Sequence, residues 1–142
     1  MATDETVTVG LGAWKPPELY DDPELERSGH KQPAEIEGPV ASIDKYQFED
    51  EAQVFTLRGE AYADDISVLQ MYRGKVLTLR HENHSGKVYI EAVRATSTDQ
   101  WDEITEFRMQ DDLMQDVTEE KQVYTYSVDL IQVEAINADS SA

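Results

Sequence analysis

The chain has 142 residues, with 30 acidic and 12 basic side chains and a formal net charge of −18 at pH 7. This length suits one domain with room for an appendage, and the negative charge argues against nucleic acid or an anionic membrane surface as partner, because both attract basic proteins. The absence of cysteine excludes disulfides, zinc–thiolate sites and cysteine nucleophiles. Neither a signal peptide nor an apolar run of about 20 residues is evident, so we expect no export and no direct membrane insertion.

The acidic residues are spread through every segment of the chain. Such an excess is typical of proteins adapted to molar salt, of calcium or polyamine binders, and of nucleic-acid mimics. Self-repulsion at this charge destabilises a compact state in dilute buffer, whereas at about 1 M salt the Debye length falls to about 3 Å. Because the acids are dispersed and lysines number only six, we favour the halophile interpretation and expect high salt to be required.

Residues 1–39 differ from the rest of the chain, since they hold all five prolines and four of the seven glycines. Proline removes a backbone donor, so this segment is predicted to be an extended Pro/Gly-rich arm. The arm docks either on its own domain or on a neighbouring subunit. Its apolar anchors are Trp14, Leu19, Tyr20 and Leu25. The domain is then expected to span residues 40–135, with a frayed polar tail at 136–142.

The domain begins with recognisable periodic segments. Alternation over residues 53–58 predicts a strand that ends at Gly59. Residues 63–72 are predicted to form a helix, with Asp64 as its N-cap and Gly74 just beyond its end.

The remaining segments are mostly strand-like. Two alternating runs, 75–81 and 87–95, predict a hairpin with a five-residue connection. Residues 122–134 predict a closing strand. Segment 97–122 is ambiguous, because its apolar residues suit either a helix or a strand, but its nine acids and two basic residues favour an exposed excursion. The predicted core consists of Phe55, Leu57, Ile66, Leu69, Leu77, Leu79, Val88, Ile90, Val128 and Leu130.

No catalytic signature accompanies these elements. The chain has no Gly-rich phosphate loop, nucleophile elbow or metalloprotease helix. His81 and His84 form an H-x-x-H pair, but the sequence nominates no third ligand, so we interpret them as solvated loop residues. We expect no catalytic, cofactor-binding or metal-binding residues.

One window of the chain is basic. Arg73, Lys75, Arg80, Lys87 and Arg94 lie among only two acids, which makes the window +3, whereas residues 97–122 carry −7. The positive charge protects the edge of a sheet, meets the acidic segment of another copy, or contacts nucleic acid, the last being the least favoured.

Four runs within residues 53–133 share an order of elements with a known group of proteins: FTLRGEAY (55–62), YRGKVLTL (72–79), GKVYIEAV (86–93) and YTYSVDLI (124–131). In this order they resemble tail-tube and baseplate proteins of tailed viruses. Those families place a G-x-A turn after an early strand, L-x-x-x-x-G-K after a helix, and Y-x-Y-x-V-x-L in the last strand. The resemblance implies a mainly β fold, a β-sandwich or split β-barrel flanked by one short helix, that assembles into rings without enzyme activity.

Together with the acidic composition, the resemblance implies a structural component of the tail, in its distal or baseplate region, of a virus of a halophilic archaeon. Such a protein assembles in the host cytoplasm and works in the virion through contacts with copies of itself and other tail proteins. The expected contact residues are Trp14, Leu19, Tyr20, Leu25, Arg73, Lys75, Arg80, Lys87, Arg94, Trp101 and Phe107. The alternative is a cytoplasmic ligand-binding β-barrel module or small enzyme of a halophile, with its ligand inside the barrel.

Overall fold

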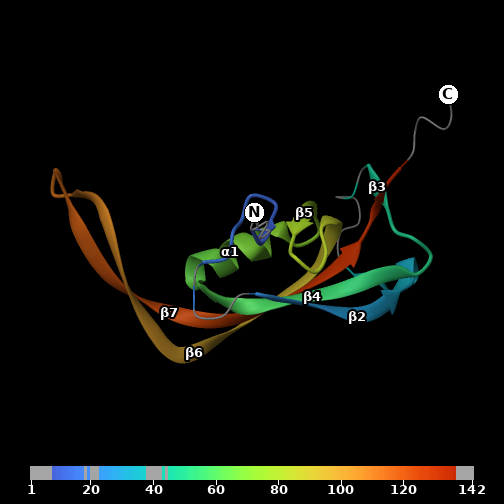
Figure 1. Cartoon of the computed structure of the whole chain (residues 1–142), viewed down its shortest axis with the longest axis horizontal. Helices are drawn as coiled ribbons and strands as arrows, with labels where there is room; N and C mark the ends of the chain where they lie inside the picture. The colour runs from blue at the N-terminus through green and yellow to red at the C-terminus, as the bar shows by residue number, and fades with distance from the viewer. Residues whose placement is uncertain (1–7, 18, 20–22, 38–42, 44, 137–142) are drawn as a thin grey trace, which may run out of the picture.

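The computed structural model describes residues 8–17, 19, 23–37, 43 and 45–136. Six antiparallel strands form a sheet in the order β1-β5-β6-β7-β4-β2, and β3 pairs with β8 in a two-stranded sheet (Figure 1). The elements are β1 (Gly10–Leu11), β2 (Glu24–Lys31), the 3₁₀ helix η1 (Pro33–Glu35), β3 (Tyr46–Gln47), β4 (Ala52–Tyr62), α1 (Ala63–Tyr72), β5 (Val76–Arg80), β6 (Gly86–Gln110), β7 (Leu113–Gln132) and β8 (Glu134–Ala135). The predicted class, mainly β with one short helix, is confirmed.

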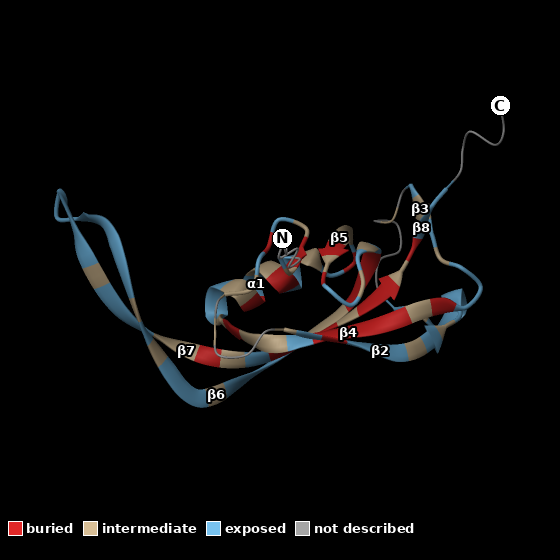
Figure 2. Ribbon diagram, in the orientation of Figure 1, coloured by how far each residue is buried: buried red, intermediate tan, exposed pale blue. Residues whose placement is uncertain are grey.

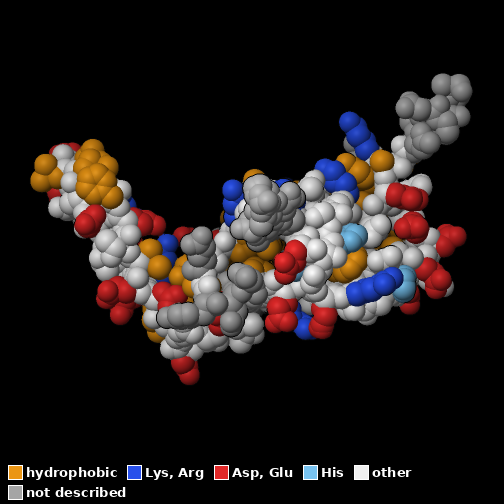
Figure 3. Space-filling view, in the orientation of Figure 1, with side chains coloured by type: hydrophobic (Ala, Val, Ile, Leu, Met, Phe, Trp, Pro, Cys, Tyr) orange, Lys and Arg blue, Asp and Glu red, His pale blue; other side chains and the backbone are white. Residues whose placement is uncertain are grey.

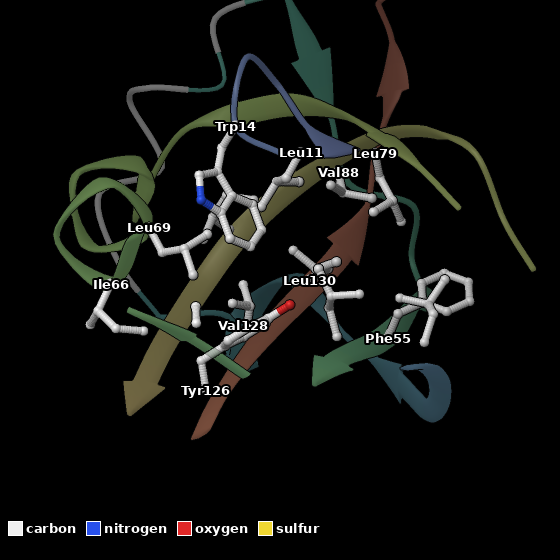
Figure 4. Packing of buried hydrophobic residues seen from close by; sticks show 14 residues of the cluster. Leu11, Trp14, Phe55, Ile66, Leu69, Leu79, Val88, Tyr126, Val128 and Leu130 are labelled. Carbon is white, nitrogen blue, oxygen red and sulfur yellow. The ribbon is translucent and has the colours of Figure 1, made fainter. Parts of the chain in front are cut away.

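The six-stranded sheet curls around one hydrophobic core. Leu11 of β1 and Leu25 of β2, the two edge strands, are buried in the same cluster as Leu69 of α1. The His81 ring Nε2 lies 2.9 Å from the carbonyl oxygen of Pro23, which ties the end of β5 to the start of β2. The sheet is therefore open but strongly curled, as a split barrel is, with α1 on its inner side (Figure 4).

The predicted core residues all belong to this cluster. Alternation along β4, β5, β6 and β7 turns every second side chain inward. Helical spacing places Ile66 and Leu69 on the inward face of α1. Leu77 packs against the cluster while remaining partly exposed, and the other nine predicted residues are buried.

The strand predicted to end at Gly59 continues to Tyr62. Gly59 of β4 is paired with Tyr126 of β7. A Cβ atom at Gly59 would lie 2.6 Å from the hydroxyl oxygen of this tyrosine. The glycine therefore makes room for a buried tyrosine, and it is not a turn residue.

Helix α1 spans the predicted residues, but its start differs in detail. Tyr62 is the N-cap, not Asp64, and its N–H donates to Asp65 Oδ2 at 3.1 Å. Gly74 follows the helix with φ of 85°, as expected of a residue that ends it. Among the described residues, no helix is long and apolar enough to cross a membrane.

The first 39 residues contain part of the domain, contrary to the predicted boundary. Strand β2 pairs with β4 from Glu24↔Arg58 to Lys31↔Ala52, and β1 pairs with β5. Pro23 stands just before β2 and Pro33 just after it, so the prolines flank an edge strand without interrupting it. The polar composition of this segment reflects the exposure of β2, in which Leu25 is the one buried residue.

Candidate functional site

The most distinctive feature of the molecule is a projecting hairpin. Pairing of β4 with β7 ends at Tyr62↔Val123. Beyond it β6 and β7 pair with each other alone among the described strands, from Trp101↔Gln122 to Gln110↔Leu113. Residues 101–122, which we call the ribbon, run away from the body and bend toward the side where α1 lies (Figure 1). At about 3.4 Å per residue the ribbon is about 30 Å long.

The turn at the tip of the ribbon explains how two long strands reverse direction. Asp111 and Asp112 have φ of 52° and 65°. Two successive left-handed residues match the twist of a tight hairpin, and aspartate tolerates this conformation better than most residues. Segment 97–122 is thus a hairpin, and the prediction of an exposed excursion is confirmed.

The base of the ribbon is anchored to the body. The Tyr62 hydroxyl donates to Asp102 Oδ2 at 2.8 Å, and Lys121 Nζ lies 5.8 Å from the centre of the Tyr62 ring. Burial, followed by the bond to Asp102, raises the pKa of Tyr62 to about 12. A register shift between Ser97 and Trp101 lies at the same point.

The two faces of the ribbon differ chemically, because directly opposed residues share a face. One face carries an ion-paired arginine, Arg108, whose guanidinium contacts Glu106 and Glu119. The other face continues the helix side of the sheet. Its large side chains are Trp101, Phe107, Met109 and Met114.

These apolar side chains are exposed. Relative exposure is 56% for Trp101, 65% for Phe107, 61% for Met109 and 51% for Met114. Leu113, beside the turn on the opposite face, is 64% exposed. Figure 2 shows the ribbon as almost entirely exposed, and Figure 3 shows hydrophobic side chains gathered at its tip.

The exposure of this tip makes it a candidate contact surface. A two-stranded hairpin with no third strand is marginally stable in water, and a gathered exposed apolar patch marks an interaction site. Of the predicted contact residues, Phe107 lies near this tip, and Trp101 lies on the same face at the base of the ribbon.

The arm residues are placed differently from the prediction. Trp14 and Leu25 are buried in the core of their own domain. The Trp14 indole N–H donates to Asp65 Oδ1 at 2.9 Å, and its ring packs edge-on against Tyr126 (Figure 4). These two residues are therefore not subunit contacts in this conformation. Leu19 is half-buried, and Tyr20 lies outside the described residues.

The basic window does not form one patch. Arg73, Lys75 and Lys87 are exposed, whereas Arg80 donates to the carbonyl oxygen of Gly12 at 3.1 Å. Arg94 lies on the outer face of the sheet. Basic residues that are close in the sequence therefore lie on different surfaces of the molecule.

The outer face of the sheet has a polar hollow that the sequence does not predict. Arg58, Ser127 and Arg94 stand side by side on β4, β7 and β6, because Ser127 is paired with both arginines. With Lys31 and Val54 they line a hollow of about 310 Å³, which we call the outer hollow. It joins side chains from four strands, so no local pattern marks it.

Ion pairs shape the outer hollow. Lys31 Nζ contacts Glu91 at 2.7 Å, and Arg94 contacts Asp129 at 2.8 Å. Glu91 is buried and also accepts the backbone N–H of Glu37 at 3.0 Å. The bond to Asp129 is the main cause that raises the pKa of Arg94 above its ordinary value, so this arginine stays charged.

The two histidines are not solvated loop residues, contrary to the interpretation from sequence. His81 is buried, and its Nδ1 accepts the backbone N–H of Asn83 at 3.0 Å. His84 stacks on Phe55 with ring centres 4.5 Å apart, and burial lowers its pKa. Both close the open side of the curled sheet. In the described part of the chain, no three acidic or histidine side chains gather as metal ligands.

No known protein family matches this chain, and no curated protein or solved structure does so either.

Proposed function

We propose that this protein is a structural subunit of the tail of a virus infecting a halophilic archaeon, in the distal or baseplate region, and that it assembles into rings. The observation that carries the proposal is the ribbon. It places exposed Phe107, Met109 and Met114 about 20–27 Å from its base at the body. Neighbouring copies in a ring supply the cover that this surface lacks.

The packing of the body supports a structural role over ligand binding. A ligand-binding barrel needs space inside the sheet. Here the inner side is filled by large side chains from α1, β4 and β7, among them Leu57, Leu69, Tyr126 and Leu130 (Figure 4). The observation favours subunit contacts as the working surface of the protein.

Charge sets the conditions for assembly. Copies with a net charge of −18 repel one another in dilute buffer. Molar salt screens this repulsion and strengthens apolar contacts only modestly, so association is expected at high salt and not at low salt. Other virion tail proteins are expected to bind the same assembly.

Electron microscopy of the purified chain in molar potassium chloride tests the proposal. Closed rings or stacked rings are the expected result. Particles that remain single domains at every protein concentration, or turnover of a small substrate, would contradict it and favour the ligand-binding module.

A further inference from the structure

We propose that the ribbon tip of one copy docks in the outer hollow of the next copy. This inference rests on the self-assembly proposed above and names the two surfaces that meet. The tip consists of the acidic turn Asp111–Asp112 and its apolar neighbours. The lining of the outer hollow includes three basic residues, two acidic residues and an apolar one: Lys31, Arg58, Arg94, Glu91, Asp129 and Val54.

The outer hollow offers hydrogen-bond donors to the acidic tip, although each of its three basic residues is paired with one carboxylate. The tip carries Asp111 and Asp112 at its turn, both exposed. Arg58 and Arg94 flank the Ser127 hydroxyl on adjacent strands and are themselves largely exposed, at 58% and 63% of their side chains. Each is shown with one carboxylate contact, Glu26 for Arg58 and Asp129 for Arg94. A guanidinium has five N–H donors, so each retains donors for an incoming carboxylate.

The outer hollow also borders an apolar surface that the apolar side chains of the tip can contact. Val54 lines the outer hollow and belongs to a second core cluster on the outer side of the sheet. Ile36, Tyr46 and Phe48 pack on the same cluster and are only partly buried. The methionines and Phe107 beside the acidic turn therefore have an apolar surface to contact at the Val54 side of the hollow.

The tip reaches another copy and not its own hollow. β2, which borders the outer hollow, lies at the opposite end of the molecule from the tip (Figure 1). A contact between two different surfaces of identical chains is heterologous, and its repetition closes a ring or builds an open filament. The inferred contact thus supplies the geometry that a ring requires.

Charge variants give the first test, by sedimentation in molar potassium chloride. R58E/R94E should weaken self-association by about three- to tenfold, because carboxylates replace the guanidinium donors that hold Asp111 and Asp112 in direct contact, while molar salt screens the longer-range repulsion. D111N/D112N removes the tip charge while keeping residues that tolerate the left-handed turn, and should weaken it as well. The matched control is K15E/R27E, which reverses two exposed basic residues that do not line the hollow and should leave association within about twofold.

Cross-linking gives a second test that does not depend on the stability of the charge variants. The chain has no cysteine, so Q110C and S127C each introduce one thiol, at the tip and in the outer hollow. A mixture of the two single variants, treated with a short bifunctional maleimide, should give a covalent dimer. A mixture of Q110C with S67C, which places the thiol on the exposed side of α1, should not.

The outcomes separate this inference from the proposed function. Wild-type assemblies that tolerate R58E/R94E and cross-link Q110C no better to S127C than to S67C would overturn the docking but leave ring assembly standing. A wild-type chain that stays monomeric at high salt would overturn both.

Discussion

Removing the apolar side chains at the ribbon tip should impair assembly and spare the fold. F107T/M109T replaces two side chains that are 65% and 61% exposed with a residue that keeps strand propensity. Full burial of such a side chain contributes about 1.5–3 kcal/mol. Since roughly three-fifths of that area is free to be covered by another copy, the pair should contribute about 2–4 kcal/mol, or about 30- to 700-fold in affinity.

The assay compares self-association and folding of the same variant at high salt. Sedimentation should show the loss of affinity, whereas the thermal midpoint should stay close to wild type, because changes at exposed positions usually fall within about 0.5 kcal/mol. The control is M71T, since Met71 is 68% exposed on α1, outside the ribbon. Unchanged association of F107T/M109T, or an equal loss in M71T, would refute the reasoning.

Four further outcomes are expected. The thermal midpoint should rise steadily from dilute buffer to molar potassium chloride, and equal midpoints would remove the halophile interpretation. A chain that lacks residues 1–39 should fail to fold, as judged by circular dichroism, because it loses Leu11, Trp14 and Leu25 from the core. A cooperative thermal transition near the wild-type midpoint would show that the core does not need these residues. G59A should destabilise by about 1–3 kcal/mol in urea unfolding by overpacking. Y126F should relieve only part of that loss, because the new Cβ would lie 2.6 Å from the Tyr126 hydroxyl but also 2.9 Å from the ring carbon Cζ, which Phe retains; additive effects would contradict this packing. The pKa of Tyr62 is raised to about 12 from an ordinary 10.0, so its contribution to stability is complete below about pH 10 and is lost as the pH rises toward 12. Wild type should therefore lose more stability than Y62F over this pH range. Parallel pH profiles of the two proteins would exclude the effect.

The local elements of the domain were readable from the sequence because their periods are clear. Alternation places Leu79 and Ile90 on the inner face of their strands, and helical spacing places Ile66 and Leu69 on the face of α1 that packs against that inner face, as the structure confirms. The exposed excursion was recognised from its acidic charge. Its secondary structure is ambiguous in the sequence, since Trp101 and Phe107 fit a helix with Ile104 and a strand with Met109. The Asp111–Asp112 turn also lacks the glycine that usually marks a hairpin.

Long-range pairing could not be read in the same way. Strand β2 has few apolar residues because it lies at the edge of the sheet, so only its partner β4 identifies it as part of the domain. Gly59 was read as the end of a strand, because nothing nearby in sequence shows the tyrosine that approaches it from β7. In the outer hollow, Ser127 lies between Arg58 and Arg94 on adjacent strands. These three residues come together only when β4, β7 and β6 are paired in this register.

The most direct test of the central claim is the mass of the full chain in molar potassium chloride, measured by sedimentation equilibrium over a range of protein concentrations. Assembly through the ribbon predicts a defined multiple of the 16.1 kDa chain, and loss of that species in F107T/M109T. A mass of one chain at every concentration would contradict the account.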